Sequence, residues 1–384
     1  MAITITTEPT ADGKYSAYFP IQFQATETSN PDYLYFLVRN SNGTLIDGVS
    51  YYKAANINDV FYFDASSYIK ALLNVRSEQG LSLTAIEDLT NCYGKYEVIV
   101  NTTPIVTDAE VSNEFFCFPF LDNVRFLNNE TANNGINNKK LLYSLDPINS
   151  IFDIKEIGTY DRVNIFVQET YLYLDTYNLD NPTNGTLPTQ TLRIDLSAYT
   201  NKIISIPLNK TFVSTNFTKV GGGFILDYKS FGLNLVNPAL GEPIIKYKVN
   251  NKCNTKEFIY INRYGVKENI IFKSTDNKYI KTQSDIFKVA GYSHLGKATS
   301  FNTSADSQKI NQKTEEVITI DGYKVLRKYE NALIDFLTSP TVWLAAAEPQ
   351  RINIFDGTYK ITEQGKGMEI SFKYSFAQEK KSFV

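Results

Sequence analysis

Short apolar runs of strand length recur along the whole chain and constrain its fold more than any other feature. Ile3-Thr4-Ile5-Thr6 alternates apolar and polar side chains at the two-residue period of a half-buried strand. Further strand-like runs follow at 33–38, 96–100, 114–118, 163–167, 192–196 and 224–228. Pairs such as Asn42-Gly43 and Asp356-Gly357, which tolerate positive φ, separate such runs. The pattern predicts a mainly β chain built of sandwiches or barrels.

Composition supports the same fold class. The 384 residues include 26 Tyr and 25 Phe but one Trp, and both Tyr and Phe favour pleated, half-buried surfaces. A chain of this length suggests two or three domains, each large enough for its own core. Two segments are exceptions, because the spacing of their apolar residues predicts short helices over 66–73 and 329–337, the second ended by Pro340.

The counts of individual residue types argue against several classes of catalytic, metal-binding and nucleic-acid-binding site. His294 is the single histidine, so a histidine metal site or a histidine-based catalytic group has no recognisable partner. Lys and Arg total 38 against 41 Asp and Glu, which is not the basic balance of a dedicated nucleic-acid binder. We therefore expect no enzymatic activity, no cofactor, no metal and no sequence-specific binding of nucleic acid.

The cysteines and the N-terminus bear on the compartment. Cys92, Cys117 and Cys253 form no C-x-x-C spacing, and we expect free, buried thiols in a reducing compartment, with a Cys92–Cys117 bridge as the open alternative. No basic region precedes a long apolar run near Met1, and no run of about 18 apolar residues occurs. The expectation is a soluble protein made in a cytoplasm, without membrane insertion.

A short similarity between two places indicates an internal repeat. Residues 63–68 and 194–199 share the pattern apolar-Asp-x-Ser-x-Tyr, and 131 positions separate their aspartates. We expect Asp and Ser to cap a short helical turn and Tyr to anchor that turn to the core. The residues concerned are Asp64, Ser66, Tyr68, Asp195, Ser197 and Tyr199. Because the offset is close to one domain length, it favours two tandem sandwiches of similar plan.

The predicted organisation follows from these runs and this repeat. An Ig-like β-sandwich occupies 1–120, a second sandwich of similar plan occupies 121–252, and a β-rich unit with one short helix occupies 253–384. Polar residues dominate 128–140 and 299–314, which we interpret as exposed loops or arms because they cannot bury enough apolar surface to order alone.

Several polar clusters fit a structural interpretation better than a functional one. Gly221-Gly222-Gly223 lacks the surroundings of a phosphate-binding loop and is typical of a hairpin tip. The loop with Asp175, Asn178 and Asp180 lacks the spacing of a calcium loop, which favours a solvated turn. Glu87-Asp88 are neighbours that would point to opposite faces of a strand, so we interpret them as solvated surface.

Tyr171 and Tyr173 form a possible contact surface. They alternate along a strand-like run and so point to one face of it. Such a pair can stack on a sugar ring or on a protein partner, although packing in a core or an interface is the more common use. The pair therefore supports a receptor- or carbohydrate-binding function as the alternative to a purely structural one.

The last third of the chain carries a recognisable element. Residues 253–261 form a strand-like run that ends in the turn Asn262-Arg263-Tyr264-Gly265, and a second strand-like run follows at 269–272. A helix, a serine and a strand containing Trp343 come at 333–344, and 368–377 has the pattern of a closing strand. These segments resemble a recurring part of tail proteins of phages that infect Bacteroidetes, and residues 17–23 resemble the first strand of the same proteins.

The resemblance implies a function of assembly. It suggests a virion component of a crAss-like or related phage, in a tail hub or connector ring, made in the host cytoplasm. The implied partners are further copies of the chain in a ring and the neighbouring tail or portal-proximal proteins. No catalytic residue comes with the resemblance, because the shared motifs are structural.

Overall fold

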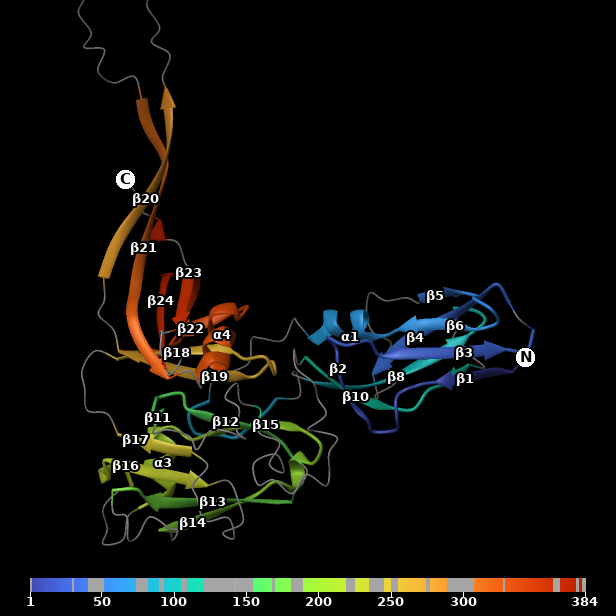
Figure 1. The fold of residues 1–384 in the computed structure, drawn as a ribbon, viewed down its shortest axis with the longest axis horizontal. Coiled ribbons are helices and arrows are strands. Elements are labelled where there is room, and N and C mark those ends of the chain that lie inside the picture. The colour runs from blue at the N-terminus through green and yellow to red at the C-terminus, as the bar shows by residue number, and fades with distance from the viewer. Residues whose placement is uncertain are drawn as a thin grey trace, which may run out of the picture.

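The computed structural model describes residues 2–29, 31–40, 52–73, 82–89, 93–104, 109–119, 142, 155–167, 170–180, 189–218, 225–234, 245–249, 255–273, 277–288, 307–326, 329–361, 367–377 and 380–381. The chain is mainly β, with two tandem Ig-like sandwiches followed by a β-rich C-terminal domain that contains one helix in its described part (Figure 1). The predicted fold class is therefore confirmed. Both predicted domain boundaries, at 120/121 and 252/253, fall outside the described residues.

The first sandwich packs a three-stranded sheet, β1-β3-β6, against a six-stranded sheet, β2-β10-β8-β4-β5 with β9 beside β8. Its elements are β1 (Ile3–Thr7), β2 (Lys14–Ser16), β3 (Gln22–Glu27), β4 (Tyr33–Asn40), β5 (Tyr52–Ala55), β6 (Phe61–Asp64), α1 (Ser66–Leu73), β8 (Gly94–Asn101), β9 (Glu110–Val111) and β10 (Phe115–Phe118). Aromatic rings fill the core, where Phe36 and Phe63 stack with centroids 5.1 Å apart. Helix α1 has the bounds predicted from the sequence, and its Ile69 packs into the same core.

The second sandwich repeats this plan. A five-stranded sheet, β11-β17-β16-β13-β14, packs against a three-stranded sheet, β12-β15-β7. The elements are β11 (Lys155–Glu156), β12 (Arg162–Phe166), β13 (Tyr171–Asn178), β14 (Gln190–Asp195), η3 (Ser197–Tyr199), β15 (Ile203–Pro207), α3 (Lys210–Asn216), η4 (Ile225–Asp227), β16 (Ser230–Asn234) and β17 (Ile245–Lys248). In both sandwiches the first strand of the larger sheet pairs in parallel with the last, β2 with β10 and β11 with β17.

Strand β7 (Glu87–Asp88) corrects the division into three consecutive units. It lies within the first predicted unit along the chain but pairs with β15 of the second sandwich, Asp88 opposite Ile204 and Glu87 opposite Ser205. Residues 82–89 thus leave the first sandwich between α1 and β8 and add an edge strand to the second. A strand of two residues has no hydrophobic period, so no sequence pattern could assign it to a distant sheet.

The motif that suggested a repeat does not mark equivalent positions. The first copy follows β6, which belongs to the smaller sheet of its sandwich, whereas the second copy follows β14, an edge strand of the larger sheet. By strand order the counterpart of β6 and α1 is β15 and α3. The similar plan of the sandwiches therefore shows in the strand order of their larger sheets, and the shared motif reflects shared turn chemistry.

The C-terminal domain is an eight-stranded sheet, β19-β18-β22-β23-β24-β21-β20 with β25 beside β21. Its elements are β18 (Thr255–Ile261), β19 (Lys267–Lys273), β20 (Asn277–Lys288), β21 (Ser307–Leu326), α4 (Glu330–Thr338), β22 (Val342–Leu344), β23 (Gln350–Ile361), β24 (Gly367–Phe376) and β25 (Lys380–Lys381). Helix α4 confirms the second predicted helix and packs Leu333 and Phe336 into the core of the sheet.

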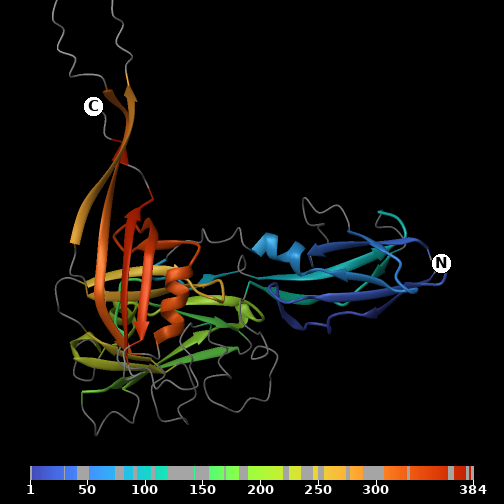
Figure 2. The same cartoon turned by 45° about the horizontal axis from the view of Figure 1, so that its top comes forward.

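Strands β20 and β21 form a long arm. β21 pairs with β24 only between Val317 and Leu326, but with β20 as far as Ser307 opposite Lys288. Residues 307–316 therefore extend beyond β24 by about 30 Å at the usual rise of a strand. Figures 1 and 2 show the arm and the first sandwich projecting from the rest of the molecule in different directions. Of the loop or arm predicted over 299–314, the described part from Ser307 onward is an arm, which backbone pairing with β20 orders. Residues 128–140 lie outside the described residues.

Cys117 is a free thiol with no exposed surface, and burial raises its pKa. The expectation of a free, buried thiol is confirmed at this position. The Cys92–Cys117 bridge left open by the sequence is not formed. Cys92, Cys253 and His294 lie outside the described residues.

Candidate functional site

A junction of apolar side chains joins all three units. The first sandwich contributes Tyr93, Phe116 and Phe118, the segment 82–89 contributes Leu89, the second unit contributes Leu142, Phe166 and Ile203, and the C-terminal domain contributes Val266 and Tyr264. Phe118 stands edge-on to the Phe166 ring, with centroids 5.6 Å apart. We call this cluster the junction, because residues from three parts of the chain share one core there.

The turn Asn262-Arg263-Tyr264-Gly265 brings the C-terminal domain into the junction. The Asn262 side chain is buried; its Oδ1 accepts hydrogen bonds from the backbone of Tyr264 at 3.0 Å and of Val266 at 3.3 Å. Its Nδ2 donates to the Leu142 carbonyl at 3.0 Å, and so ties the turn to the second unit. Asn262 thus stabilises the conformation of the turn and also bonds it to the second unit.

The other residues of the turn hold it on both sides. Arg263 forms an ion pair with Asp335 of α4 at 3.1 Å, and its backbone N–H donates to the same carboxylate at 3.0 Å. Gly265 has φ +73°, and a Cβ there would lie 2.6 Å from Cγ of Pro119, just after β10. Only glycine combines that backbone conformation with so close an approach. Trp343 lies in β22 opposite Ile259, with Lys267 Nζ 5.0 Å from its ring.

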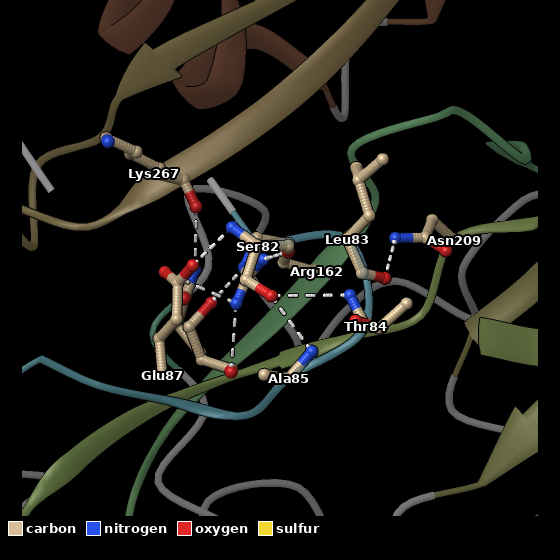
Figure 3. A network of polar contacts seen from close by, with 10 residues as sticks. Ser82, Leu83, Thr84, Ala85, Glu87, Arg162, Asn209 and Lys267 are labelled. Atoms are coloured by element: carbon tan, nitrogen blue, oxygen red, sulfur yellow. Dashed lines mark hydrogen bonds and ion pairs between the residues drawn. The ribbon is translucent and has the colours of Figure 1, made fainter. Parts of the chain in front are cut away.

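Arg162 holds residues 82–89 in place (Figure 3). We call these residues the donated segment, because they come from the first unit along the chain and add β7 to the second sandwich. The Arg162 guanidinium, which has a side-chain exposure of 3 %, donates to the carbonyls of Ser82 and of Ser205, and pairs with Glu87 at 3.4 Å. Burial lowers the pKa of Arg162, and the charge of Glu87 opposes that shift. A buried arginine in this position requires its carboxylate partner, so the segment is a constituent of the second sandwich.

Further contacts fix the register of the same segment. The Leu89 N–H donates to the Ile203 carbonyl at 2.8 Å, and Lys202 Nζ pairs with Asp88 at 2.8 Å. Asn209 caps α3 through Phe212 and donates from Nδ2 to the Leu83 carbonyl at 2.8 Å. Glu87 and Asp88 do point to different partners, but the prediction of a solvated surface is wrong, since both carboxylates are ion-paired and partly buried.

Glu257 of β18 forms a second contact between the C-terminal domain and the second sandwich. Its carboxylate accepts hydrogen bonds from Thr159 N at 2.7 Å, Tyr160 N at 2.8 Å and Asn269 Nδ2 at 2.9 Å. Burial raises the pKa of Glu257, and the nearby charge of Asp161 adds to the effect. The Tyr160 hydroxyl donates to the Ala346 carbonyl at 2.7 Å across the same contact.

The repeated motif is a capping device in both places. Asp64 Oδ1 accepts from Ser66 N at 2.9 Å and from Ile21 N at 3.0 Å, whereas Asp195 Oδ1 accepts from Ser197 N at 2.9 Å. The carboxylate, and not the serine hydroxyl, is the acceptor for the backbone of the turn. Tyr68 and Tyr199 are partly buried against the cores of their respective sandwiches.

Tyr171 and Tyr173 lie on one face of β13, as predicted, but their rings differ in how far they are accessible. The Arg193 guanidinium stands 3.8 Å from the centre of the Tyr171 ring and covers one side of it, whereas Tyr173 is 39 % exposed. The nearby carboxylates are engaged in structure: Asp175 accepts from Thr191 at 2.6 Å, and Asp180 accepts from Ser230 N at 3.0 Å. Within the described parts of the chain, no group of three or more His, Cys, Asp or Glu is placed to hold a metal.

The residues that fasten the units were missed by sequence reasoning, except for the turn at Asn262. Arg162 and Asn164 alternate with apolar residues in β12, a pattern that predicts a solvent-facing side; both are buried instead, and Asn164 Nδ2 donates to the Lys267 carbonyl at 2.8 Å. No signal in one sequence distinguishes an outer strand face from a face covered by another unit.

Comparison with known proteins adds little. No protein-family model and no curated protein matches the sequence. Among solved structures, Dpr2 Ig1-Ig2 in complex with DIP-Theta Ig1-Ig3 is 6 % identical with a TM-score of 0.19, and covers 98 % of this chain and 90 % of its own. The N-terminal four Ig domains of Dscam1 isoform 4.44 are 8 % identical with a TM-score of 0.17, and cover 99 % and 93 %. Likenesses this low carry no argument about function.

No described helix reaches the length and apolar character needed to cross a membrane.

Proposed function

We propose that this protein is a non-enzymatic structural subunit of a bacteriophage virion, part of a tail hub or connector ring, which acts by oligomeric assembly and by contact with adjacent tail or portal-proximal proteins. It would be made in the host cytoplasm and end in the tail of the particle. The proposal gives the chain a task of holding surfaces in fixed positions, with packing and hydrogen bonding as its chemistry.

The position of the Asn262–Gly265 turn carries this proposal. The four residues that resemble phage tail proteins contact the second unit through Leu142, the end of the first through Pro119, and α4 through Asp335. This turn, which is one of the segments that carry the resemblance, thus helps to join the units. Buried polar groups nearby, including Arg162 and Glu257, are also occupied with partners from another part of the chain.

The shape supports the same proposal. Two parts project from the joined body, the first sandwich and the β20–β21 arm (Figure 2). Projections that differ from each other suit a heterologous, head-to-tail interface, and such an interface closes into a ring when the rotation between copies allows it. Tyr- and Phe-rich surfaces would serve as anchors in such interfaces.

The decisive experiment is to measure the protein in purified phage particles. Quantitative mass spectrometry with isotope-labelled peptides is expected to find it at a fixed copy number of several per particle, and labelling electron microscopy is expected to place it in the tail. Absence from purified particles would reject the proposal.

The alternative is a receptor- or carbohydrate-binding tail adhesin. It rests on Tyr173, the more exposed of the two alternating tyrosines. The Tyr171 ring is less suited to stacking on a sugar because Arg193 already covers one side of it. Binding of the isolated chain to a glycan array, abolished by Tyr173→Ala and retained in Tyr62→Ala at another exposed tyrosine, would favour the adhesin.

A further inference from the structure

Charge is divided unequally along the chain. Residues 1–119 contain six Lys or Arg against fourteen Asp or Glu, whereas residues 253–384 contain nineteen Lys or Arg against fifteen Asp or Glu. The near-neutral total therefore hides an acidic first sandwich and a basic C-terminal domain. Opposite charges at two projecting ends of one molecule favour contact between copies in a head-to-tail sense.

The end of the first sandwich that is farthest from the body presents apolar side chains to solvent. Tyr33 at the start of β4 is 44 % exposed although Lys53 Nζ lies 3.7 Å from the centre of its ring, Ile57 between β5 and β6 is 57 % exposed, and Val111 of β9 is 43 % exposed. Strand pairing brings their elements together, since Tyr33 lies opposite Ala55, and Tyr35 opposite Asn101 near the end of β8. We call this surface the distal tip; it lies at the end marked N in Figure 1.

Acidic residues surround these apolar groups. Asp32 and Asp59 are exposed in connections of the distal tip, and Glu110 is exposed in β9. Hydrogen bonds fix the backbone there, from Asn56 N to the Asp32 carbonyl at 3.0 Å and from Asp59 N to Asn56 Oδ1 at 2.9 Å. An apolar centre with a charged rim is the usual composition of a protein interface.

The β20–β21 arm has the complementary composition. Its part beyond β24 includes Lys281, Lys288, Lys309 and Lys313 against Asp285, Glu315 and Glu316, and β25, which pairs with β21 there, adds Lys380-Lys381, so the arm is net positive. β20 is the terminal strand of its sheet, and β21 has β20 as its main partner over 307–316. A ribbon of two strands is marginally stable in water by itself. A second surface that covers the arm would stabilise it.

We propose that the β20–β21 arm of one copy binds the distal tip of the first sandwich of the next copy. The contact is electrostatic with an apolar centre, and strand addition is not required, because lysines on an edge strand oppose pairing with a further strand. This inference deepens the proposed function, on which it rests, by naming the two surfaces that meet between subunits. The occupant of the distal tip is a second copy of this chain.

The test is charge reversal with rescue in the full chain. Asp32→Lys with Glu110→Lys reverses the distal tip, and Lys288→Glu with Lys309→Glu reverses the arm at residues whose cross-strand partners, Ser307 and Ile286, are uncharged. Glu348→Lys, at an exposed turn before β23, is the matched control. Sedimentation velocity over a range of concentrations measures self-association, and circular dichroism checks that each variant is folded.

The expected result is specific to the pairing. Each reversal should weaken self-association at least tenfold, the two reversals mixed or combined should restore most of it, and Glu348→Lys should leave it unchanged. Association should also fall as salt rises, because salt screens the attraction between opposite charges. Carbodiimide cross-linking of a mixture of ¹⁴N and ¹⁵N chains should join a peptide of the arm to a peptide of the tip across the two isotopes.

Two failures are distinguishable. If the full chain associates but the reversals do not weaken it, or if the combined reversal does not restore it, the contact between arm and tip is wrong while assembly stands. If the full chain stays monomeric at every concentration and is absent from particles, the proposed function itself fails.

Discussion

The two sandwiches share the strand order of their larger sheets but differ in what completes the smaller ones. In the first, the smaller sheet consists of β1, β3 and β6, all from one continuous part of the chain. In the second, the smaller sheet ends in β7, which comes from the loop that follows α1 of the first. The C-terminal domain adds Glu257 and Asn262 to the second sandwich as well. The first sandwich is therefore complete with its own strands, whereas the second needs a strand and side chains from other parts of the chain.

Arg162→Ala tests this dependence with the largest expected effect. The substitution removes the guanidinium that holds Ser82, Glu87 and Ser205, and loss of one partner of a buried ion pair should destabilise the second sandwich by about 3–5 kcal/mol. Arg39→Ala, which breaks the more exposed pair with Glu97 in the first sandwich, should cost about 1 kcal/mol or less. Hydrogen exchange measures the opening free energy of each sandwich, in peptides from β12 and β15 for Arg162→Ala and in peptides from β4 and β8 for Arg39→Ala; equal effects of the two substitutions would contradict the comparison.

Gly265→Ala should loosen the junction. Alanine at φ +73° is strained and its Cβ would meet Pro119, so a loss of about 2–3 kcal/mol is expected. Gly357→Ala is the control, because its Cβ would meet only the end of the Leu337 side chain at 2.8 Å. Limited proteolysis should cut the first variant faster at the connections between units. Unchanged cleavage would show that the turn is not a fastening point.

Glu257→Gln tests the contact between the C-terminal domain and the second sandwich through pH. The raised pKa of Glu257 means that the folded state favours the protonated carboxyl, so this contribution to stability is complete below the ordinary value of 4.5 and is lost as pH rises through the raised pKa. Glutamine does not ionise and loses a hydrogen-bond acceptor, at a cost of about 1–2 kcal/mol. The advantage of the native chain over the variant in chemical unfolding should therefore shrink from pH 4 to pH 7; a growing advantage would reverse the sign of the argument.

The substitutions Asp64→Ala and Asp195→Ala remove the two capping carboxylates. We expect them to lower stability less than the other substitutions. Asp64 accepts two backbone N–H groups and begins an eight-residue helix, so its loss should cost about 1 kcal/mol. Asp195 is bonded to one backbone N–H at an exposed turn, and its substitution should have a smaller effect. Thermal unfolding of the two variants side by side measures the difference, and a larger effect at Asp195 would contradict the assignment of roles.

Much of the fold within each unit could be predicted from the sequence, because it depends on local periodicity. Helices α1 and α4 have spacings and stop signals that mark them within one residue. The Asn262–Gly265 turn was singled out through its resemblance to phage tail proteins, and not through a pattern of hydrophobic periodicity.

The contacts between units could not be predicted, for a physical reason. Burial of Arg162 and Asn164 depends on segments 80 and 103 residues away, Ser82 and Lys267, and a strand of alternating residues has the same pattern whether water or protein covers its polar side. The strand structure of the arm could not be predicted for a related reason. Its residues are polar, and their order comes from backbone pairing with β20, which leaves no hydrophobic pattern.

Because the chain is synthesised from the N-terminus, β7 is made long before the strand with which it pairs. Glu87 and Asp88 leave the ribosome more than a hundred residues before β15, their partner, which at typical elongation rates is an interval of roughly 5–25 s. During that time the segment has no sheet to join, while the first sandwich around it can already fold. Two adjacent carboxylates are well suited to this delay, because their charge discourages pairing with any other nascent strand until Arg162 and Lys202 have been made.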